Sequence, residues 1–170
     1  MYELQDIIRE LKDAVRAGDF MAAQEAVRHA AGETPFTADI ASSGLLYSDP
    51  EVTILHAVVN SGFISPPHDH RTWAIIGVYH GQEDNLFYRL VGPSRKIEQA
   101  GGRNLTEGDV MMLGPQAIHR IANRRNQKLS ALHVYGKNIF TIERSKWDPA
   151  TGTEQPFELK LDSSGRIRAR

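Results

Sequence analysis

The sequence predicts a mainly β protein, a sandwich or barrel of short strands, with two short helices at its N-terminus. Two observations lead to this prediction. Apolar residues in the first 32 positions recur at helical spacing, and from about Thr37 short apolar or alternating runs follow one another, separated by glycine, proline and asparagine. Regular short runs separated by such turn-forming residues are typical of all-β sandwiches and barrels rather than of alternating strand–helix units.

The N-terminal segment is expected to form two amphipathic helices. One helical face carries Leu4, Ile7, Ile8, Leu11 and Val15. Gly18 is a natural helix stop, and Asp19 can cap a second, alanine-rich helix that ends near Gly32. We expect residues 1–34 to form a helical appendage packed on the main domain, residues 35–170. The apolar faces leave two arrangements open, namely covering one end of a barrel or forming a homodimer contact.

The main domain is expected to consist of short strands separated by turns. The runs that predict strands are residues 52–59, 73–79, 86–90, 96–99, 109–113, 118–122, 129–135 and 139–142. Gly101 and Gly102 are expected to form one of the turns. The last residues, with Arg166, Arg168 and Arg170, are expected to form a solvated tail.

Composition excludes several classes of protein. The chain has 170 residues, which suits one domain, and its 41% hydrophobic and 24% charged residues are ordinary for a globular protein. The chain has seven histidines and no cysteine. The lack of cysteine excludes disulfides, cysteine-bound metals and a catalytic cysteine. A net charge of −1 gives no basic field for nucleic acid. No apolar run approaches the ~20 residues of a membrane span, so we expect a cytoplasmic protein without membrane or nucleic-acid partners.

Two histidines at the centre of the chain are candidate metal ligands. His68 and His70 follow two prolines and precede an apolar run. Because side chains alternate along a strand, both imidazoles point to the same face and can reach one ion. Such a short motif also occurs by chance at the polar start of a strand. A second segment favours the metal site, since Gly108 opens a tight turn, an apolar run follows, and the chain returns to His119.

Together the two segments resemble the paired motifs of the cupin superfamily. The matching residues are Gly62, His68, His70 and Gly81 in the first motif, and Gly108, Gly114, His119 and Asn123 in the second. This resemblance implies a double-stranded β-helix barrel that holds one metal ion inside. Many cupins carry a fourth ligand, a glutamate, where this chain has Ala74 and Ile75. The implied site is therefore three neutral imidazoles, which suit zinc, copper, iron and nickel.

Neighbouring residues narrow the resemblance to the thiol dioxygenases, meaning cysteine dioxygenase and 3-mercaptopropionate dioxygenase. The matching segments are residues 67–73, 77–83, 131–136 and 144–149. The resemblance implies an oxidoreductase with one Fe(II) per chain, which oxidises a small thiol, similar to 3-mercaptopropionate or cysteine, to a sulfinate with O2. A thiolate bound to the dication offsets its charge and makes oxygen activation easier.

The resemblance also assigns roles outside the metal triad. His133 and Tyr135 lie at i and i+2 on one strand, so both can face the interior, and Tyr135 matches the hydrogen-bonding tyrosine of the family. Its phenol can donate to the substrate carboxylate or to oxygen at the site. The serine of the family's Ser-His-Tyr relay is replaced by Ala131. Ile75 takes the place of the cysteine that is crosslinked to tyrosine in the mammalian enzyme.

Substrate binding is assigned to Arg144. The mammalian-type enzymes hold the substrate carboxylate with an early-strand arginine, but residues 42–47 contain neither that arginine nor the glutamine of the mercaptopropionate-type enzymes. Those enzymes use an arginine nine residues after the tyrosine, and Arg144 occupies this position. Its guanidinium can bind a carboxylate with two parallel hydrogen bonds. A surface ion pair with Glu143 or Asp148 is the alternative.

Other functions remain open at this level. One is a cupin metalloenzyme of another class, such as a diketone dioxygenase or an isomerase, and another is a cupin that binds metal or small molecules without turnover. The remaining histidines are given no ligand role. We expect His29 on a solvated helix face, His56 as a core or interface residue, and His80 near a turn.

Overall fold

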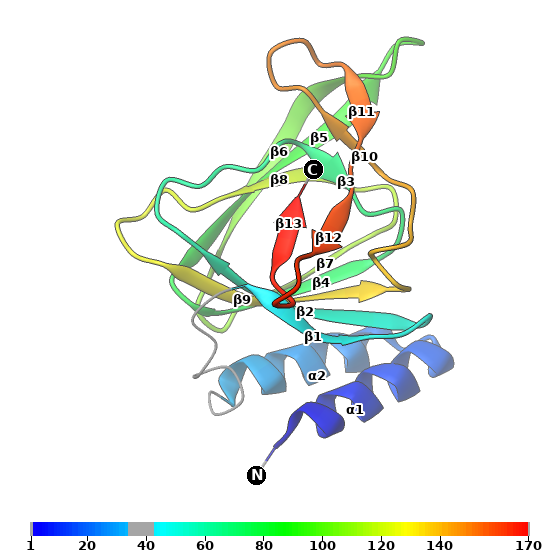
Figure 1. Ribbon diagram of the computed structural model, residues 1–170, viewed down its shortest axis with the longest axis vertical. Coiled ribbons are helices and arrows are strands. Elements are labelled where there is room, and N and C mark those ends of the chain that lie inside the picture. Colours follow the sequence, from blue (N-terminus) through cyan, green and yellow to red (C-terminus); the bar gives the residue numbers. More distant parts are fainter. Residues whose placement is uncertain (1, 34–42, 170) are drawn as a thin grey trace.

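The computed structural model describes residues 2–33 and 43–169 of the chain. Over these residues two helices lie against one of two facing β-sheets, and a short hairpin ends the chain (Figure 1). The predicted class, mainly β with two N-terminal helices, is confirmed. The expected domain boundary between residues 34 and 35, and Ser42 of the early-strand segment, lie outside the described residues.

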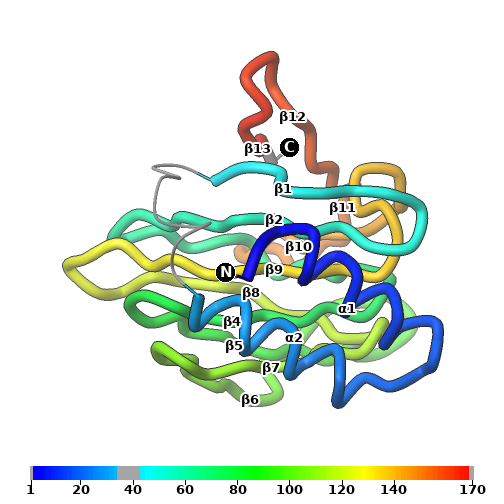
Figure 2. Tube along the Cα trace, turned by 90° about the horizontal axis from the view of Figure 1, so that it is seen from below, coloured from blue at the N-terminus to red at the C-terminus, as the bar shows by residue number. Residues whose placement is uncertain are grey.

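Helix α1 spans Leu4–Ala17 and helix α2 spans Phe20–Gly32. Gly18 ends the first helix at φ 68°, a left-handed conformation that glycine adopts without steric cost. Asp19 caps the second helix, because its side chain accepts a hydrogen bond from the backbone N–H of Ala22. Figure 2 shows both helices lying across the same sheet.

The first sheet has five strands in the order β1-β2-β9-β4-β7. Their bounds are β1 Gly44–Ser48, β2 Val52–Val59, β4 Ala74–His80, β7 Val110–Leu113 and β9 Leu129–Gly136. The second sheet has six strands in the order β11-β10-β3-β8-β5-β6. These are β3 His68–Asp69, β5 Gln82–Val91, β6 Lys96–Thr106, β8 Ile118–Ala122, β10 Ser145–Trp147 and β11 Glu154–Pro156.

The chain passes repeatedly from one sheet to the other. From β2 to β5 consecutive strands alternate between the sheets, and after the β5–β6 hairpin they alternate again from β6 to β9. The returning strands pair antiparallel with the outgoing ones, β9 with β2, β8 with β3 and β7 with β4. A paired ribbon wound in this way is consistent with the expected double-stranded β-helix. The two sheets nevertheless face each other without closing into a continuous barrel.

The first sheet separates two apolar clusters. Toward the helices, Ile54, Ile75 and Val134 pack with apolar residues of α1 and α2. Toward the second sheet, Leu55, Ile76 and other apolar side chains form an interior cluster. Because side chains alternate along each strand, the same strands contribute apolar residues to both clusters. The helices cover the outer face of this sheet, and the inner face remains available for a site.

Close helix–sheet packing depends on Gly77 of β4. A Cβ atom added at this glycine would lie 2.7 Å from Cγ1 of Val27 on α2. Helix α2 can therefore approach the sheet because position 77 has no side chain.

Several expected elements differ in the structure. Residues 96–99 belong to a longer strand that continues through Gly101 and Gly102 to Thr106, so the turn predicted there is wrong. Residues 139–142 form a turn rather than a strand. The last residues form a hairpin of β12 Leu159–Leu161 and β13 Ile167–Ala169. Arg166 and Arg168 are exposed, as expected for a solvated tail, whereas Arg170 lies outside the described residues. The apolar residues Leu159 and Ile167 pack on the interior cluster, which stabilises the hairpin.

Candidate metal centre

The structure brings His68, His70 and His119 together between the two sheets. His68 lies on β3 and pairs with His119 on β8, while His70 directly follows β3. The three side chains are buried, and their potential ligand nitrogens all lie within 4.8 Å of one another. The triad predicted from the sequence is therefore a buried cluster that could hold one metal ion.

Two of the three imidazoles have an acceptor that orients them toward the cluster. The Nδ1 atom of His68 lies 2.9 Å from the carbonyl oxygen of Pro66, and Nδ1 of His119 lies 2.8 Å from Oδ1 of Asn85. Because these oxygens accept, each Nδ1 carries the hydrogen and each Nε2 keeps its lone pair. Ligating histidines commonly donate their other ring N–H in this way.

The spacing of the ligand atoms also fits a metal. The Nε2 atoms of His70 and His119 are 3.4 Å apart. At metal–nitrogen distances of about 2.0–2.1 Å, two tetrahedral ligands lie about 3.4 Å from each other. Burial lowers the pKa of His68 to about 4 and the pKa values of His70 and His119 well below the usual range. The charge of Arg144 lowers the pKa values of His68 and His70 further. All three imidazoles are therefore uncharged at pH 7 and can donate a lone pair to a metal ion.

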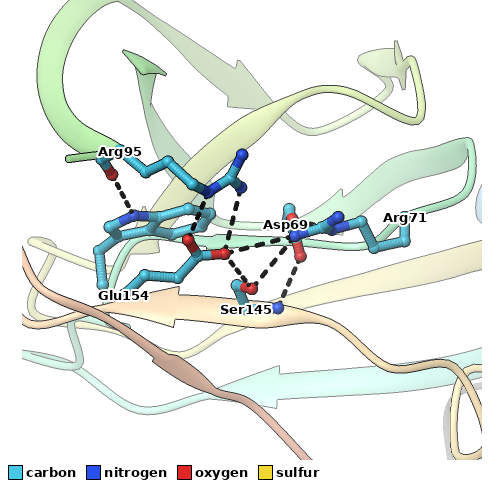
Figure 3. A network of polar contacts seen from close by, with 6 residues as sticks. Asp69, Arg71, Arg95, Ser145 and Glu154 are labelled. Atoms are coloured by element: carbon cyan, nitrogen blue, oxygen red, sulfur yellow. Dashed lines mark hydrogen bonds and ion pairs between the residues drawn. The ribbon is translucent and has the colours of Figure 1, made fainter. Parts of the chain in front are cut away.

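A polar network on the outside of the second sheet supports the ligand segment (Figure 3). Asp69 lies between the two ligand histidines, and its carboxylate accepts hydrogen bonds from the backbone N–H of Ser145, at 2.8 Å, and from Arg71. Glu154 accepts from the Ser145 hydroxyl at 2.6 Å and from Arg95, also at 2.6 Å. These contacts tie β3 to β10 and β11, and they set the position from which His68 and His70 extend.

A second network runs through the interior and connects the triad with Tyr135. The side-chain amide of Asn85 donates to Glu83 at 3.0 Å, and the other carboxylate oxygen of Glu83 lies 2.9 Å from Nε2 of His133. Nδ1 of His133 lies 3.3 Å from the Tyr135 hydroxyl. All four side chains are buried. The Tyr135 ring also lies at 5.0 Å from that of His70, which brings it beside the triad.

Sequence reasoning missed Glu83 and Asn85. Both lie on β5, at i and i+2, on its inner face. The signal was present as the alternation that continues this strand upstream of the predicted residues 86–90. With Ala131 in place of the relay serine, His133 contacts the Glu83 carboxylate through Nε2 and the Tyr135 hydroxyl through Nδ1.

The position beside Tyr135 is Ala74, not Ile75. Ala74 pairs directly with Tyr135 and shares the interior cluster with it. Ile75 points to the opposite face and packs against the helices. Ile75, which takes the place of the crosslinked cysteine in the resemblance, therefore does not lie beside Tyr135 in this structure. The small side chain at position 74 leaves room beside the tyrosine ring.

Arg144 is buried and faces the same cavity as the triad. Only 5% of its surface is exposed, and its guanidinium carbon lies 4.7 Å from the centre of the Phe157 ring. Its Nε and Nη2 atoms are buried without a hydrogen-bond partner. Within residues 2–33 and 43–169, no salt bridge involves Arg144. The alternative of a surface pair with Glu143 or Asp148 is thus not what the structure contains.

The cavity has a volume of about 390 Å3. Its polar residues are the triad, His133, Tyr135 and Arg144, with Ser43, Asn60 and Ser65 at the side. The remaining wall is apolar and includes Leu55, Phe63, Ile121, Phe157, Leu159 and Ile167. Burial raises the pKa of Tyr135 to about 12, and the nearby Glu83 adds to this, so its phenol is protonated at neutral pH.

The other histidines lie away from this cavity, as expected. His29 is exposed on α2, and His80 is exposed at the end of β4. His56 is fully buried on β2 and contacts Tyr79. Among the described residues, no helix is long and apolar enough to cross a membrane.

Comparison with known proteins identifies relatives in fold. No protein-family model matches the chain. A structure from Bacillus halodurans aligns with 60% of this chain and 75% of its own at a TM-score of 0.51 and 10% identity. An RmlC-like cupin family protein with a double-stranded β-helix fold, from Methanocaldococcus jannaschii, aligns with 59% of this chain and 85% of its own at a TM-score of 0.48 and 17% identity.

A Cupin 2 conserved barrel domain protein from Salinispora arenicola aligns with 64% of this chain and 76% of its own, at a TM-score of 0.44 and 20% identity. At 10% identity, the similarity to the structure from Bacillus halodurans bears on the fold alone.

Proposed function

We propose that this protein is a non-haem Fe(II) dioxygenase that oxidises a small thiol acid to its sulfinate with O2. His68, His70 and His119 would hold one iron per chain. When bound there, iron supplies a site for the substrate thiolate and for oxygen activation. The proposal extends the resemblance of the sequence to thiol dioxygenases, and 3-mercaptopropionate or a cysteine-like thiol is the substrate class that this resemblance implies.

The observation that carries the proposal is the unpaired Arg144 guanidinium beside three neutral imidazoles. A buried charge without a partner is costly, and its cost is relieved when an anion binds. Nε and Nη2 form one edge of the guanidinium, and both lack partners. That edge matches a carboxylate with two parallel hydrogen bonds. A substrate with a carboxylate at one end and a metal-binding thiol at the other would satisfy both parts of the cavity.

The remaining residues would position this substrate and exclude water. Phe157 covers one face of the Arg144 guanidinium and lies 5.1 Å from the His68 ring, so it holds the arginine beside the triad. The apolar wall keeps water from the reacting atoms, which strengthens the interaction between Arg144 and a carboxylate. Tyr135 is a protonated hydroxyl next to His70 and would contact the bound substrate beside the triad.

Metal content and oxygen consumption test the proposal directly. Protein purified from iron-replete cells should contain about one iron per chain. Oxygen uptake should then be measured with 3-mercaptopropionate, cysteine, cysteamine and an acetylacetone-like diketone. Uptake with the thiols supports the proposal. Uptake with the diketone alone would assign another class of cupin enzyme, and no uptake by iron-loaded protein would favour a binding protein.

The carboxylate role has its own test. Arg144→Gln removes two charge-assisted hydrogen bonds, and hydrogen bonds to charged groups contribute about 1.5–3 kcal/mol each. We expect the KM for acidic thiols to rise by at least about 10-fold, with little change for cysteamine. Arg89→Gln is the matched control, because Arg89 is an exposed arginine paired with Glu98. Equal effects of Arg144→Gln on acidic and non-acidic thiols would contradict the assignment.

A further inference from the structure

Glu83 is a fully buried carboxylate from which two arms of hydrogen-bonded residues extend. One arm runs through Asn85 to His119, and the other runs through His133 to Tyr135. Its Oε1 atom accepts from the Asn85 amide, which leads to the ligand His119. Its Oε2 atom lies 2.9 Å from His133, which leads to Tyr135. Glu83 is on β5 of the second sheet, whereas His133 and Tyr135 are on β9 of the first. The carboxylate therefore bridges the two sheets beside the triad.

The arm through Asn85 decides which nitrogen of His119 can bind a metal. Asn85 presents its NH2 group to Glu83, whose Oε1 accepts the hydrogen bond. The carbonyl oxygen of Asn85 is then left for His119, and it accepts from Nδ1. The lone pair of His119 consequently lies on Nε2, the atom that faces His70 in the cluster.

The arm through His133 decides how Tyr135 presents its hydroxyl. Glu83 accepts from Nε2 of His133, so when this imidazole carries a single hydrogen its lone pair lies on Nδ1. That lone pair faces the Tyr135 hydroxyl at 3.3 Å, so the phenol hydrogen points to His133. Tyr135 then presents its oxygen lone pairs, rather than its hydrogen, to the cavity. This orientation differs from the donor role expected from the sequence.

We propose that Glu83 is a positioning residue that sets the tautomers of His119 and His133 together, and through them the direction of the metal ligand and of the Tyr135 hydroxyl. The tautomers follow from the contacts alone. Their consequence for a bound thiol acid rests on the proposed function.

Both arms require a hydrogen-bond acceptor from residue 83. Glutamate supplies two acceptors, whereas an isosteric glutamine supplies one acceptor and one donor. In Glu83→Gln, the glutamine oxygen can accept from Asn85 only if the glutamine NH2 group faces His133. His133 must then carry its hydrogen on Nδ1. If instead the glutamine oxygen faces His133, Asn85 must turn over, and His119 carries its hydrogen on Nε2, where the metal should bind. One arm must change.

The test uses protein with 15N-labelled histidine, with zinc alone as a diamagnetic probe ion. In the wild-type protein, the 15N shifts should report a hydrogen on Nε2 of His133 and on Nδ1 of His119. In zinc-loaded Glu83→Gln, where zinc holds Nε2 of His119, we expect the hydrogen of His133 to move to Nδ1. Asn85 still accepts from Nδ1 of His119 in this arrangement, so zinc should bind more tightly than to a variant that lacks the Asn85 amide, for which a loss of about 10- to 100-fold is typical.

Two further variants keep the test decisive. Asn85→Ala cuts only the arm to His119, so zinc binding should weaken while His133 keeps its hydrogen on Nε2. Asp84→Asn is the matched control, since Asp84 is the neighbouring acid on β5 and makes its contact with Gln82 instead. It should leave both tautomers and zinc affinity unchanged. If Glu83→Gln loses its fold, Asn85→Ala alone tests the arm to His119.

The proposal is overturned if zinc-loaded Glu83→Gln keeps both wild-type tautomers. It is also overturned if Asn85→Ala binds zinc as the wild-type protein does. Neither readout needs turnover, so a negative oxygen-uptake panel would count against the proposed function without deciding the role of Glu83.

Discussion

Acidification of the metal-free protein should reveal the buried triad through stability. Burial holds the pKa of His68 at about 4 and lowers those of His70 and His119 strongly, against about 6.5 in an unfolded chain. Below pH 6.5 the unfolded state therefore binds more protons than the native state. Stability conferred by the neutral triad is present above this pH and is lost as the pH falls.

The magnitude follows from the same shifts. At pH 5 His68 favours the unfolded state by about 2 kcal/mol relative to pH 8, and the lowered pKa values of His70 and His119 add to this in the same direction. A typical domain has a free energy of unfolding of about 5–15 kcal/mol. The metal-free protein should thus lose a large part of its stability between pH 7 and pH 5.

Urea unfolding of chelator-treated protein, followed by tryptophan fluorescence, measures this loss. Between pH 6 and pH 5 the free energy of unfolding should fall by more than the ~1 kcal/mol that His68 contributes, and the fall should be smaller in His119→Gln. His80→Gln, at an exposed position, serves as the control and should follow the wild-type curve. A change below 2 kcal/mol between pH 7 and pH 5, or a His119→Gln curve parallel to the wild type, would refute this reasoning.

Three further outcomes are expected. Gly77→Ala should destabilise the protein by about 1–3 kcal/mol in urea unfolding, because the new Cβ lies 2.7 Å from Val27, and the added cost should shrink in the double variant with Val27→Ala. Asp69→Asn should weaken zinc binding by about 10- to 100-fold in a competition titration, because it removes an acceptor from Ser145 or Arg71; unchanged affinity would contradict the supporting role of the outer network. Zinc affinity of the native protein should change by less than about threefold between pH 7 and pH 6, since the neutral triad releases no protons on binding, and a tenfold fall would contradict the lowered pKa values.

Local patterns in the sequence were sufficient for much of the site. His68 and His70 share a face because alternate side chains of an extended chain point the same way, and His133 and Tyr135 do so for the same reason. His119 was added by the resemblance to the cupin motifs. The helices were predictable from apolar spacing together with the cap at Asp19.

Contacts between the sheets were not accessible from the sequence. Glu83 meets His133 only because β5 and β9 face each other, and Ala74 rather than Ile75 lies beside Tyr135 because of the pairing register. Arg144 follows a segment that looks like a strand but forms a turn, and its burial depends on Phe157 from a later part of the chain.

By itself, then, the sequence determined the mainly β class, the two helices and the common face of His68 and His70. These depend on backbone geometry over a few neighbouring residues. The tertiary structure decided which carboxylate orients the imidazoles, which side chain lies next to Tyr135, and that Arg144 lacks a partner in the cavity. Those features depend on strand register and on how the ribbon winds between the sheets, and local periodicity carries no information about either.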